Sequence, residues 1–478
     1  MHAADSVGSS RSSESLNTPL GVWYPQKLPL PRHYEIVKRA LIVSPHFPPI
    51  NAADHQRVRM ALPYFEQFGW QVTILAVEPN RVEGVRDPVL VQTLPKATRV
   101  VWTRAIPARW MRLAGAGNLA YRAFGSLRRA GETLLRSGEF DLIFFSTTVF
   151  PIMSLGSRWR RKFGVRYVLD FQDPWLSDYY QQHPEQRPPG GRLKYGFSHW
   201  LAKKLEPPTV RGASHVVCVS PAYSQTFLQR YPDLTPDLFT TLPFGAPELD
   251  FSALDELGVT QSAFDPHDGR DHWVYIGRGG ADMSFAVRAF FIALKRHSQE
   301  HPGLVDRLQI HFIGTDYAPK DRARKTIEPL ARDCGVEGIV SEQTDRLPYF
   351  ETLRCLRDAS ALFIPGSDDP GYTASKLYPY ILAKKPLLAV FNGASSVVEV
   401  LRRTGAGKVV TFGIGRKLES VADEIYREWF ANWPLSTPAT NWEAFAFYTA
   451  KEMTRRLCDV FDRASGGRSE RIRFSLHR

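Results

Sequence analysis

A lysine and several small polar residues follow an apolar run in the second half of the chain. Residues 361–364 predict a buried strand, and the Gly/Pro/Asp segment 365–371 predicts a loop after it. We expect Thr373 or Ser375 to cap the next helix, with Lys376 in its first turn. Free N–H groups at a helix start, together with a lysine charge, favour an anion such as a phosphate. The alternative is an ordinary strand–helix unit with a solvated lysine.

Two carboxylates follow another predicted strand in the first half of the chain. The strand at 166–169 leads into the sequence D-F-Q-D-P-W, which places Asp170 and Asp173 at its carboxyl end. Ligands bind at that edge of open α/β sheets, so both are site candidates and Asp173 is the candidate catalytic residue. The alternative for Asp173 is a turn or a helix cap beside Pro174.

Further candidates lie in the loops after other predicted strands. Asn51 and Arg57 follow the strand at 40–44, and Thr147 follows the strand at 141–146. The first of these loops has no G-x-G-x-x-G sequence, so a dinucleotide-binding fingerprint is absent.

Two blocks of alternating strands and helices have to position these residues. Strands are expected at 40–44, 71–77, 141–146, 166–169 and 214–220, and then at 272–276, 308–313, 336–340, 361–364, 387–391 and 408–411. Helices are expected at 58–68, 220–231, 284–297, 319–333, 346–358, 395–403, 418–430 and 441–464. This order predicts an α/β fold with two Rossmann-like domains and a cleft between two lobes.

The domain boundaries follow from the same pattern. We predict a disordered Ser/Pro-rich tail (1–37), an N-terminal Rossmann-like domain (38–245), a linker (246–271), a C-terminal Rossmann-like domain (272–435), a terminal helix (436–464) that packs on the N-terminal domain, and a basic tail (465–478).

The composition favours an anionic partner. The 478 residues include 61 Lys+Arg against 49 Asp+Glu, a net charge of +12. Nucleic acid, a phosphorylated substrate or an acidic membrane surface would suit this charge. The basic residues are not interleaved with stacking aromatics, so we expect no nucleic acid. Four dispersed cysteines argue against a disulfide framework and a zinc site, and no apolar run suggests a signal peptide or membrane span, so we expect a cytoplasmic protein.

Segment 104–136 contains seven arginines and one acid, Glu132, and a second basic cluster lies at 157–162. A basic helix with Trp110 and Met111 nearby is compatible with an anionic membrane surface, which makes a location at the inner membrane face possible. The alternative is a helix packed on the domain with a solvated basic face.

Several short segments, taken in their order, resemble one known family. They are L-I-V-S-P-H-F-P-P (41–49), D-F-Q-D-P-W (170–175), H-V-V-C-V-S (215–220), Y-I-G-R (275–278) and S-K-L-Y-P-Y (375–380). Together they resemble the retaining, nucleotide-sugar-dependent glycosyltransferases of the GT-B fold, family four, in particular its capsule and exopolysaccharide members.

The resemblance implies transfer of a hexose from a nucleotide diphosphate sugar to a glycan or lipid-linked hydroxyl, with retention and without a metal or other cofactor. It implies that the donor diphosphate contacts Gly277, Arg278, Thr373, Ser375 and Lys376. The other residues expected at the cleft are Asn51, Arg57, Thr147, Asp170, Gly371 and Tyr372.

The chain departs from the family's pattern at several positions. Pro379 stands where the family has the glutamate that holds the donor ribose, and Gln172 replaces an arginine. These changes leave two alternatives open, a GT-B-fold partner or scaffold protein without catalysis and a GT-B nucleotide-sugar epimerase.

Overall fold

The computed structural model describes residues 37–113, 117–177, 181, 191–316, 318, 322–369 and 376–466. The predicted N-terminal tail up to residue 36 and the basic tail after residue 466 lie outside this part. The predicted site residues Gly371, Tyr372, Thr373 and Ser375 lie outside it as well.

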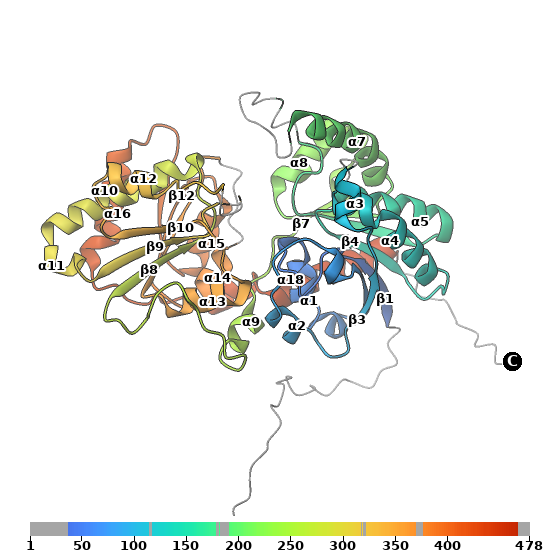
Figure 1. Ribbon diagram of the computed structural model, residues 1–478, viewed down its shortest axis with the longest axis horizontal. Helices are drawn as coiled ribbons and strands as arrows, with labels where there is room; N and C mark the ends of the chain where they lie inside the picture. The colour runs from blue at the N-terminus through green and yellow to red at the C-terminus, as the bar shows by residue number, and fades with distance from the viewer. Residues whose placement is uncertain are drawn as a thin grey trace, which may run out of the picture. The chain divides into compact units, whose positions relative to one another are not determined.

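The first sheet has seven parallel strands in the order β3-β2-β1-β4-β5-β6-β7 (Figure 1). Their bounds are β1 Lys38–Val43, β2 Trp70–Val77, β3 Arg99–Thr103, β4 Leu142–Ser146, β5 Arg166–Phe171, β6 His215–Cys218 and β7 Phe239–Thr241. The central strands are apolar along their length because helices cover both faces, as is usual for parallel sheets. Leu41, Ile42 and Phe144 are completely buried.

The second sheet has six parallel strands in the order β10-β9-β8-β11-β12-β13. Their bounds are β8 Asp271–Ile276, β9 Leu308–Ile313, β10 Val340–Gln343, β11 Ala361–Pro365, β12 Leu387–Asn392 and β13 Lys408–Phe412. The predicted α/β class with two Rossmann-like sheets is therefore confirmed.

Helices separate most of the strands along the chain. They are α1 Gln56–Ala61, α2 Val89–Gln92, α3 Ala108–Leu113, α4 Leu119–Leu135, α5 Leu155–Phe163, α7 Arg192–Arg211, α8 Pro221–Arg230, α9 Glu248–Ala253, α10 Ser284–Glu300, α11 Pro302–Val305, α12 Glu328–Asp333, α13 Tyr349–Asp358, α14 Leu377–Leu382, α15 Ser396–Thr404, α16 Leu418–Glu428, α17 Trp442–Ala446 and α18 Ala450–Ser465. The sequence analysis assigned no element to β3 or to α7.

The single terminal helix expected at 441–464 is wrong, because the chain forms α17 and α18 there. Thr449 separates them, and its side chain accepts a hydrogen bond from the Glu452 amide at 3.2 Å, which caps α18. The apolar side of α18 packs on the first sheet. The ring of Phe461, which is completely buried, lies 5.3 Å from that of Trp70 and 5.0 Å from that of Phe144.

Two other helices are shorter than expected. The helix predicted at 58–68 ends at Ala61, before Pro63, and a 3-10 turn, Phe65–Phe68, replaces its second half. Of the helix predicted at 319–333, the described part forms only α12. Its first turn is fixed from outside, because the Glu342 carboxylate accepts hydrogen bonds from the amides of Ile327 and Glu328, both at 2.9 Å.

The segment predicted as a linker, 246–271, is an ordered part of the fold. It contains α9, and Leu254 is completely buried. The carboxylate of Asp250 accepts two hydrogen bonds from Arg59, at 2.8 and 2.5 Å. One acidic residue of this segment therefore forms a buried ion pair, which a linker would not be expected to contain.

Candidate functional site

The strand order reverses once in each sheet, and each reversal has polar loops at its carboxyl edge. In the first sheet the reversal lies between β1 and β4, and in the second it lies between β8 and β11. Such switch points are where open α/β sheets bind ligands. The loops after β1 and β4 carry His46, Asp54 and Thr147, and those after β8 and β11 carry Gly277 and Lys376. Each sheet thus has one candidate site.

In the second sheet, Tyr380 holds α14 against the end of β8. Its phenol oxygen accepts a hydrogen bond from the Ile276 amide at 2.6 Å and donates to the Ile276 carbonyl at 3.2 Å. Lys376 lies one turn earlier, at the N-cap of α14. Its Nζ donates to the Tyr275 hydroxyl at 2.7 Å and lies 4.6 Å from the centre of that ring. The helix thereby brings a cation to the switch point.

Gly277 leaves the space that this ammonium needs. A Cβ atom at Gly277 would lie 2.0 Å from Nζ of Lys376. The predicted pair of Gly277 and Lys376 is therefore in direct contact. The expected caps Thr373 and Ser375 are outside the described residues, and within the described part the N-cap of α14 is Lys376, whose side chain makes no capping bond.

The environment of Lys376 is unfavourable for its charge. Burial, followed by the charges of Arg278 and Arg346, lowers the pKa of Lys376 to about 7, although the carboxylate of Asp282 acts in the opposite direction. A lysine that is half-protonated near neutral pH gains from any anion that binds beside it.

Arg278 lies next to this lysine and is held by Asp282. The two Nη atoms donate to the two carboxylate oxygens at 2.9 and 2.7 Å, and both side chains are about a third exposed or less. Burial by itself would raise the pKa of Asp282, but the bonds from Arg278 and Ser367 leave it lowered. Because Asp282 neutralises Arg278, Lys376 is the cation with the greater need of a counter-charge.

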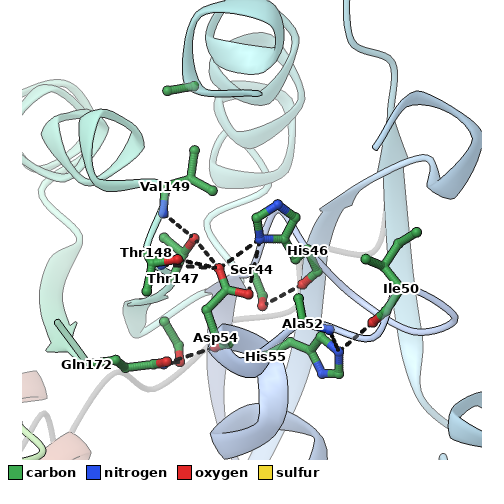
Figure 2. A network of polar contacts seen from close by, with 12 residues as sticks. Ser44, His46, Ile50, Ala52, Asp54, His55, Thr147, Thr148, Val149 and Gln172 are labelled. Carbon is green, nitrogen blue, oxygen red and sulfur yellow. Dashed lines mark hydrogen bonds and ion pairs between the residues drawn. The ribbon is translucent and has the colours of Figure 1, made fainter. Parts of the chain in front are cut away.

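In the first sheet, Asp54 is the centre of the polar network in Figure 2. Its carboxylate contacts Nδ1 of His46 at 2.9 and 3.0 Å, and accepts hydrogen bonds from the Thr147 hydroxyl and the Thr148 amide, each at 3.1 Å. Burial would raise the pKa of Asp54, but the bond from His46, the charge of that ring and the Thr148 amide lower it below its usual value. Asp54 therefore stays ionised.

This arrangement fixes the tautomer of His46. An ionised carboxylate only accepts hydrogen bonds, so Nδ1 carries the proton and Nε2 has a free lone pair in the neutral ring. Figure 2 shows Nε2 on the side of the ring away from Asp54. The His46 side chain is 20% exposed and that of Asp54 only 3%. A histidine held in this way by a buried carboxylate has the geometry of a general base.

Arg57 and Asp170 form a buried ion pair beneath the Asp54 network. Both are completely buried, and Nε of Arg57 donates to Oδ2 of Asp170 at 2.8 Å. Gln172 donates to the same oxygen at 2.8 Å and to the Asp54 carbonyl at 2.9 Å, so it joins the two groups. The structure thus places these residues where they position the loop of Asp54.

The remaining candidates of the first sheet are peripheral to the Asp54 network. Asp173 is exposed, and partial desolvation, followed by the charge of Asp54, raises the pKa of its carboxyl group. Asn51 is half-buried, and its backbone N–H donates to the Val85 carbonyl at 2.8 Å. Nothing tests the catalytic role expected of Asp173, which stays a prediction.

Sequence reasoning missed His46, Asp54, Tyr275 and Tyr380. His46 and Asp54 are two of the titratable residues that follow the first strand, and their types and place were the available signal. Tyr275 and Tyr380 gave no comparable signal, since each also fits an apolar core position. Their role follows only from the contact between β8 and α14.

The arginine-rich segment is partly structural. Arg122 is buried and donates to the carbonyls of Gly117, Arg81 and Ile106 at 2.9–3.1 Å. Glu132 binds Arg158 at 3.1 Å and Lys162 at 2.6 Å. Arg122 is therefore not available to a surface, and the cluster at 157–162 is partly neutralised. The membrane association expected from this segment remains a prediction.

The described residues contain neither a cluster of metal-ligating side chains nor a membrane-spanning helix. No cluster of three or more His, Cys, Asp or Glu side chains there could hold a metal ion, and the predicted independence of metals and cofactors remains a prediction. None of the helices that the described residues form is long and apolar enough to cross a membrane.

Residues 55–245 match the model of a family described as "Glycosyl transferase 4-like domain", and no curated protein matches the chain. The fold is similar to that of a Rickettsia africae glycosyltransferase (13% identity, TM-score 0.55, covering 90% of this chain and 99% of that one). It is also similar to the N-terminal domain of Candida albicans trehalose-6-phosphate phosphatase (13%, 0.56, 92% and 100%) and to Anabaena HepE in complex with UDP and glucose (14%, 0.53, 88% and 99%).

These likenesses show the fold, and the predicted GT-B architecture is confirmed. The family match confirms the predicted resemblance to glycosyltransferases for the first half of the chain. The retaining course and the exopolysaccharide type remain predictions.

Proposed function

We propose that the chain transfers a sugar from a nucleotide diphosphate sugar to a hydroxyl group of a glycan or lipid-linked acceptor. The observation that carries this proposal is Lys376, held against Gly277 at the switch point of the second sheet, with a pKa lowered to about 7 by burial and by neighbouring cations. A diphosphate supplies the negative charge that this environment lacks.

The Lys376 ammonium also suits the chemistry of the transfer. When the bond between sugar and diphosphate breaks, negative charge develops on the leaving oxygen, and a preorganised cation there lowers the barrier. Lys376 and Arg278 are our candidates for this role, and the amides at the start of α14 add donors. The complex of Anabaena HepE with UDP and glucose makes UDP-sugars the first donors to test.

On the acceptor side we assign the proton transfer to His46. Nε2 of this ring has the free lone pair, and Asp54 stabilises the imidazolium that forms when the acceptor hydroxyl loses its proton. If this base acts in a single direct displacement, the anomeric centre is inverted. The family resemblance predicts retention, so the anomeric configuration of the product separates a direct displacement from a retaining course.

Pro379 limits how the donor is held. It is the third residue of α14, where a missing N–H is tolerated because the first helical amides have no partner within the helix. Proline offers no group to bind ribose hydroxyls, so the ribose-binding residue of the family has no equivalent at this position. A binding protein without turnover is the alternative that this substitution favours.

A donor panel tests the proposal. UDP-, GDP- and ADP-sugars should include one that stabilises the chain by about 2.7 kcal/mol at a hundred times its dissociation constant, and that is converted to nucleoside diphosphate when an acceptor is present. CMP-sugars, which carry a single phosphate, are the matched control and are expected to stabilise much less.

The outcomes are distinguishable. Stabilisation without release of nucleoside diphosphate across a panel of glycan and lipid-linked acceptors would favour the scaffold alternative. An unchanged melting temperature with every nucleotide diphosphate sugar would contradict the proposal.

A further inference from the structure

Helix α7 carries a row of exposed apolar side chains. Leu193, Phe197 and Trp200 are 93%, 55% and 54% exposed. Their spacing of four and three residues places them on one face of the helix. Together they form what we call the apolar row of α7. Single exposed apolar residues are common on proteins, but a row along one helix face is not.

The opposite face anchors the helix in the first domain. Ala202, Thr209 and Val210 are buried there. Glu206 is completely buried and accepts hydrogen bonds from the Leu176 amide at 2.9 Å and from Tyr231 at 2.8 Å, and it forms an ion pair with Arg230 at 2.8 Å. With this face fixed, the apolar row points away from the domain core.

The charges of α7 are arranged around the row. Lys194, Lys203 and Lys204 are exposed, and Lys204 continues the row four residues after Trp200. The acidic residue of the helix, Glu206, is buried and paired. The exposed face of α7 is therefore apolar along its middle and cationic at its flanks.

We propose that the apolar row and the lysines of α7 dock on an anionic lipid bilayer. An anionic bilayer offers both chemistries at the same depth, with acyl chains for the row and headgroup charges for the lysines. Tryptophan suits this position because its ring is apolar while its N–H needs a polar partner. The charge complementarity favours this occupant over a second copy of the chain, which would bring the same lysines together.

This inference does not depend on the proposed function, since it uses no residue of either candidate site. It is also separate from the membrane surface expected from segment 104–136, of which Arg122 is buried. The ring of Phe197 lies 6.3 Å from that of Tyr121 on α4, a helix of segment 104–136, so the apolar row lies beside that segment.

Vesicle flotation of the full chain tests the inference. We expect the protein to float with phosphatidylglycerol-containing vesicles at low salt, to stay behind with pure phosphatidylcholine, and to be released at high salt because ions screen the attraction. The variant Leu193→Ser/Phe197→Ser/Trp200→Ser should lose binding. The variant Lys194→Glu/Lys203→Glu/Lys204→Glu should bind anionic vesicles roughly a hundredfold less.

A matched control exists on the second sheet. Ile414 is fully exposed and Lys417 is exposed, both after β13, so Ile414→Ser/Lys417→Glu makes the same kinds of change elsewhere. This variant should float like the wild type, and all variants should keep the wild-type melting temperature. A wild type that does not float, or an apolar-row variant that floats unchanged, overturns the inference. A wild-type dimer in sedimentation that the apolar-row variant converts to a monomer overturns it as well, because the row would then join two copies.

Discussion

Replacing Lys376 with methionine is expected to weaken binding of the nucleotide diphosphate sugar by about 10- to 100-fold. Methionine keeps the length and the apolar stem of the side chain but removes the charge and the donor that lies against Gly277 and Tyr275. Calorimetric titration of both proteins with the donor that stabilises the wild type measures the difference.

The fold should tolerate this change. Burial and like charges lower the pKa of Lys376 in the folded protein, so below its ordinary pKa the charged lysine costs stability rather than adding it. Between the lowered pKa of Lys376 in the folded protein and its ordinary pKa in the unfolded chain, raising the pH increases the free energy of unfolding. The methionine variant is therefore expected to melt at the wild-type temperature or above.

Lys385 offers a matched control within the same domain. Burial lowers its pKa as well, but it precedes β12 and so lies at the amino edge of the sheet. Lys385→Met should leave donor affinity unchanged. Equal affinity in the wild type and Lys376→Met would remove this lysine from the donor site, and equal losses in both lysine variants would point to a general charge effect.

The second large effect is expected at His46. The change His46→Asn should reduce kcat by about 10²- to 10⁴-fold, the usual contribution of a general base, while donor affinity stays the same. Steady-state kinetics, with the donor affinity measured separately, provide these values.

Asp54→Asn tests whether the pair acts as a unit. Asparagine retains the size of the side chain but offers no charge to a protonated imidazole, so we expect a kcat between those of the wild type and His46→Asn. His267, exposed in the loop before β8, gives the control His267→Asn, which should behave as wild type. Wild-type kcat in His46→Asn, together with a product of retained configuration, would contradict the role of His46 and favour the course expected from the family.

The sequence was sufficient to predict the two sheets because their strands are continuous apolar runs. Runs such as Leu41–Ile42–Val43 and Leu362–Phe363–Ile364 are buried on both faces and require helices around them. Strand β3 was not predicted, because its short apolar run lies at the edge of the sheet and is only partly buried. Helix α7 was not predicted either, because its outward face is apolar and its end contains Pro207 and Pro208.

The candidate site was predictable only in part. Gly277, Arg278 and Lys376 were found because each follows a strand and resembles a family motif. The pairing of Arg278 with Asp282 and the lowered pKa of Lys376 arise from tertiary packing, which spacing does not encode. Arg57 and Asp170 were expected at the surface of the site, but a strand-end position does not reveal that a charged side chain is buried in an ion pair.

The most direct test of the central claim, that the donor diphosphate binds against Lys376, is a count of protons taken up on binding. The diphosphate of a nucleotide sugar does not titrate near neutrality, so any protons taken up on binding are taken up by the protein. Titrating the donor at about pH 8 in two buffers of different ionisation enthalpy should show the wild type taking up close to one proton, because Lys376, with a pKa of about 7, is mostly neutral until the anion binds. At about pH 6 the uptake should be close to zero, and in Lys376→Met it should be absent at both values. Binding without proton uptake in the wild type at the higher pH, or the same uptake in Lys376→Met, would contradict the account.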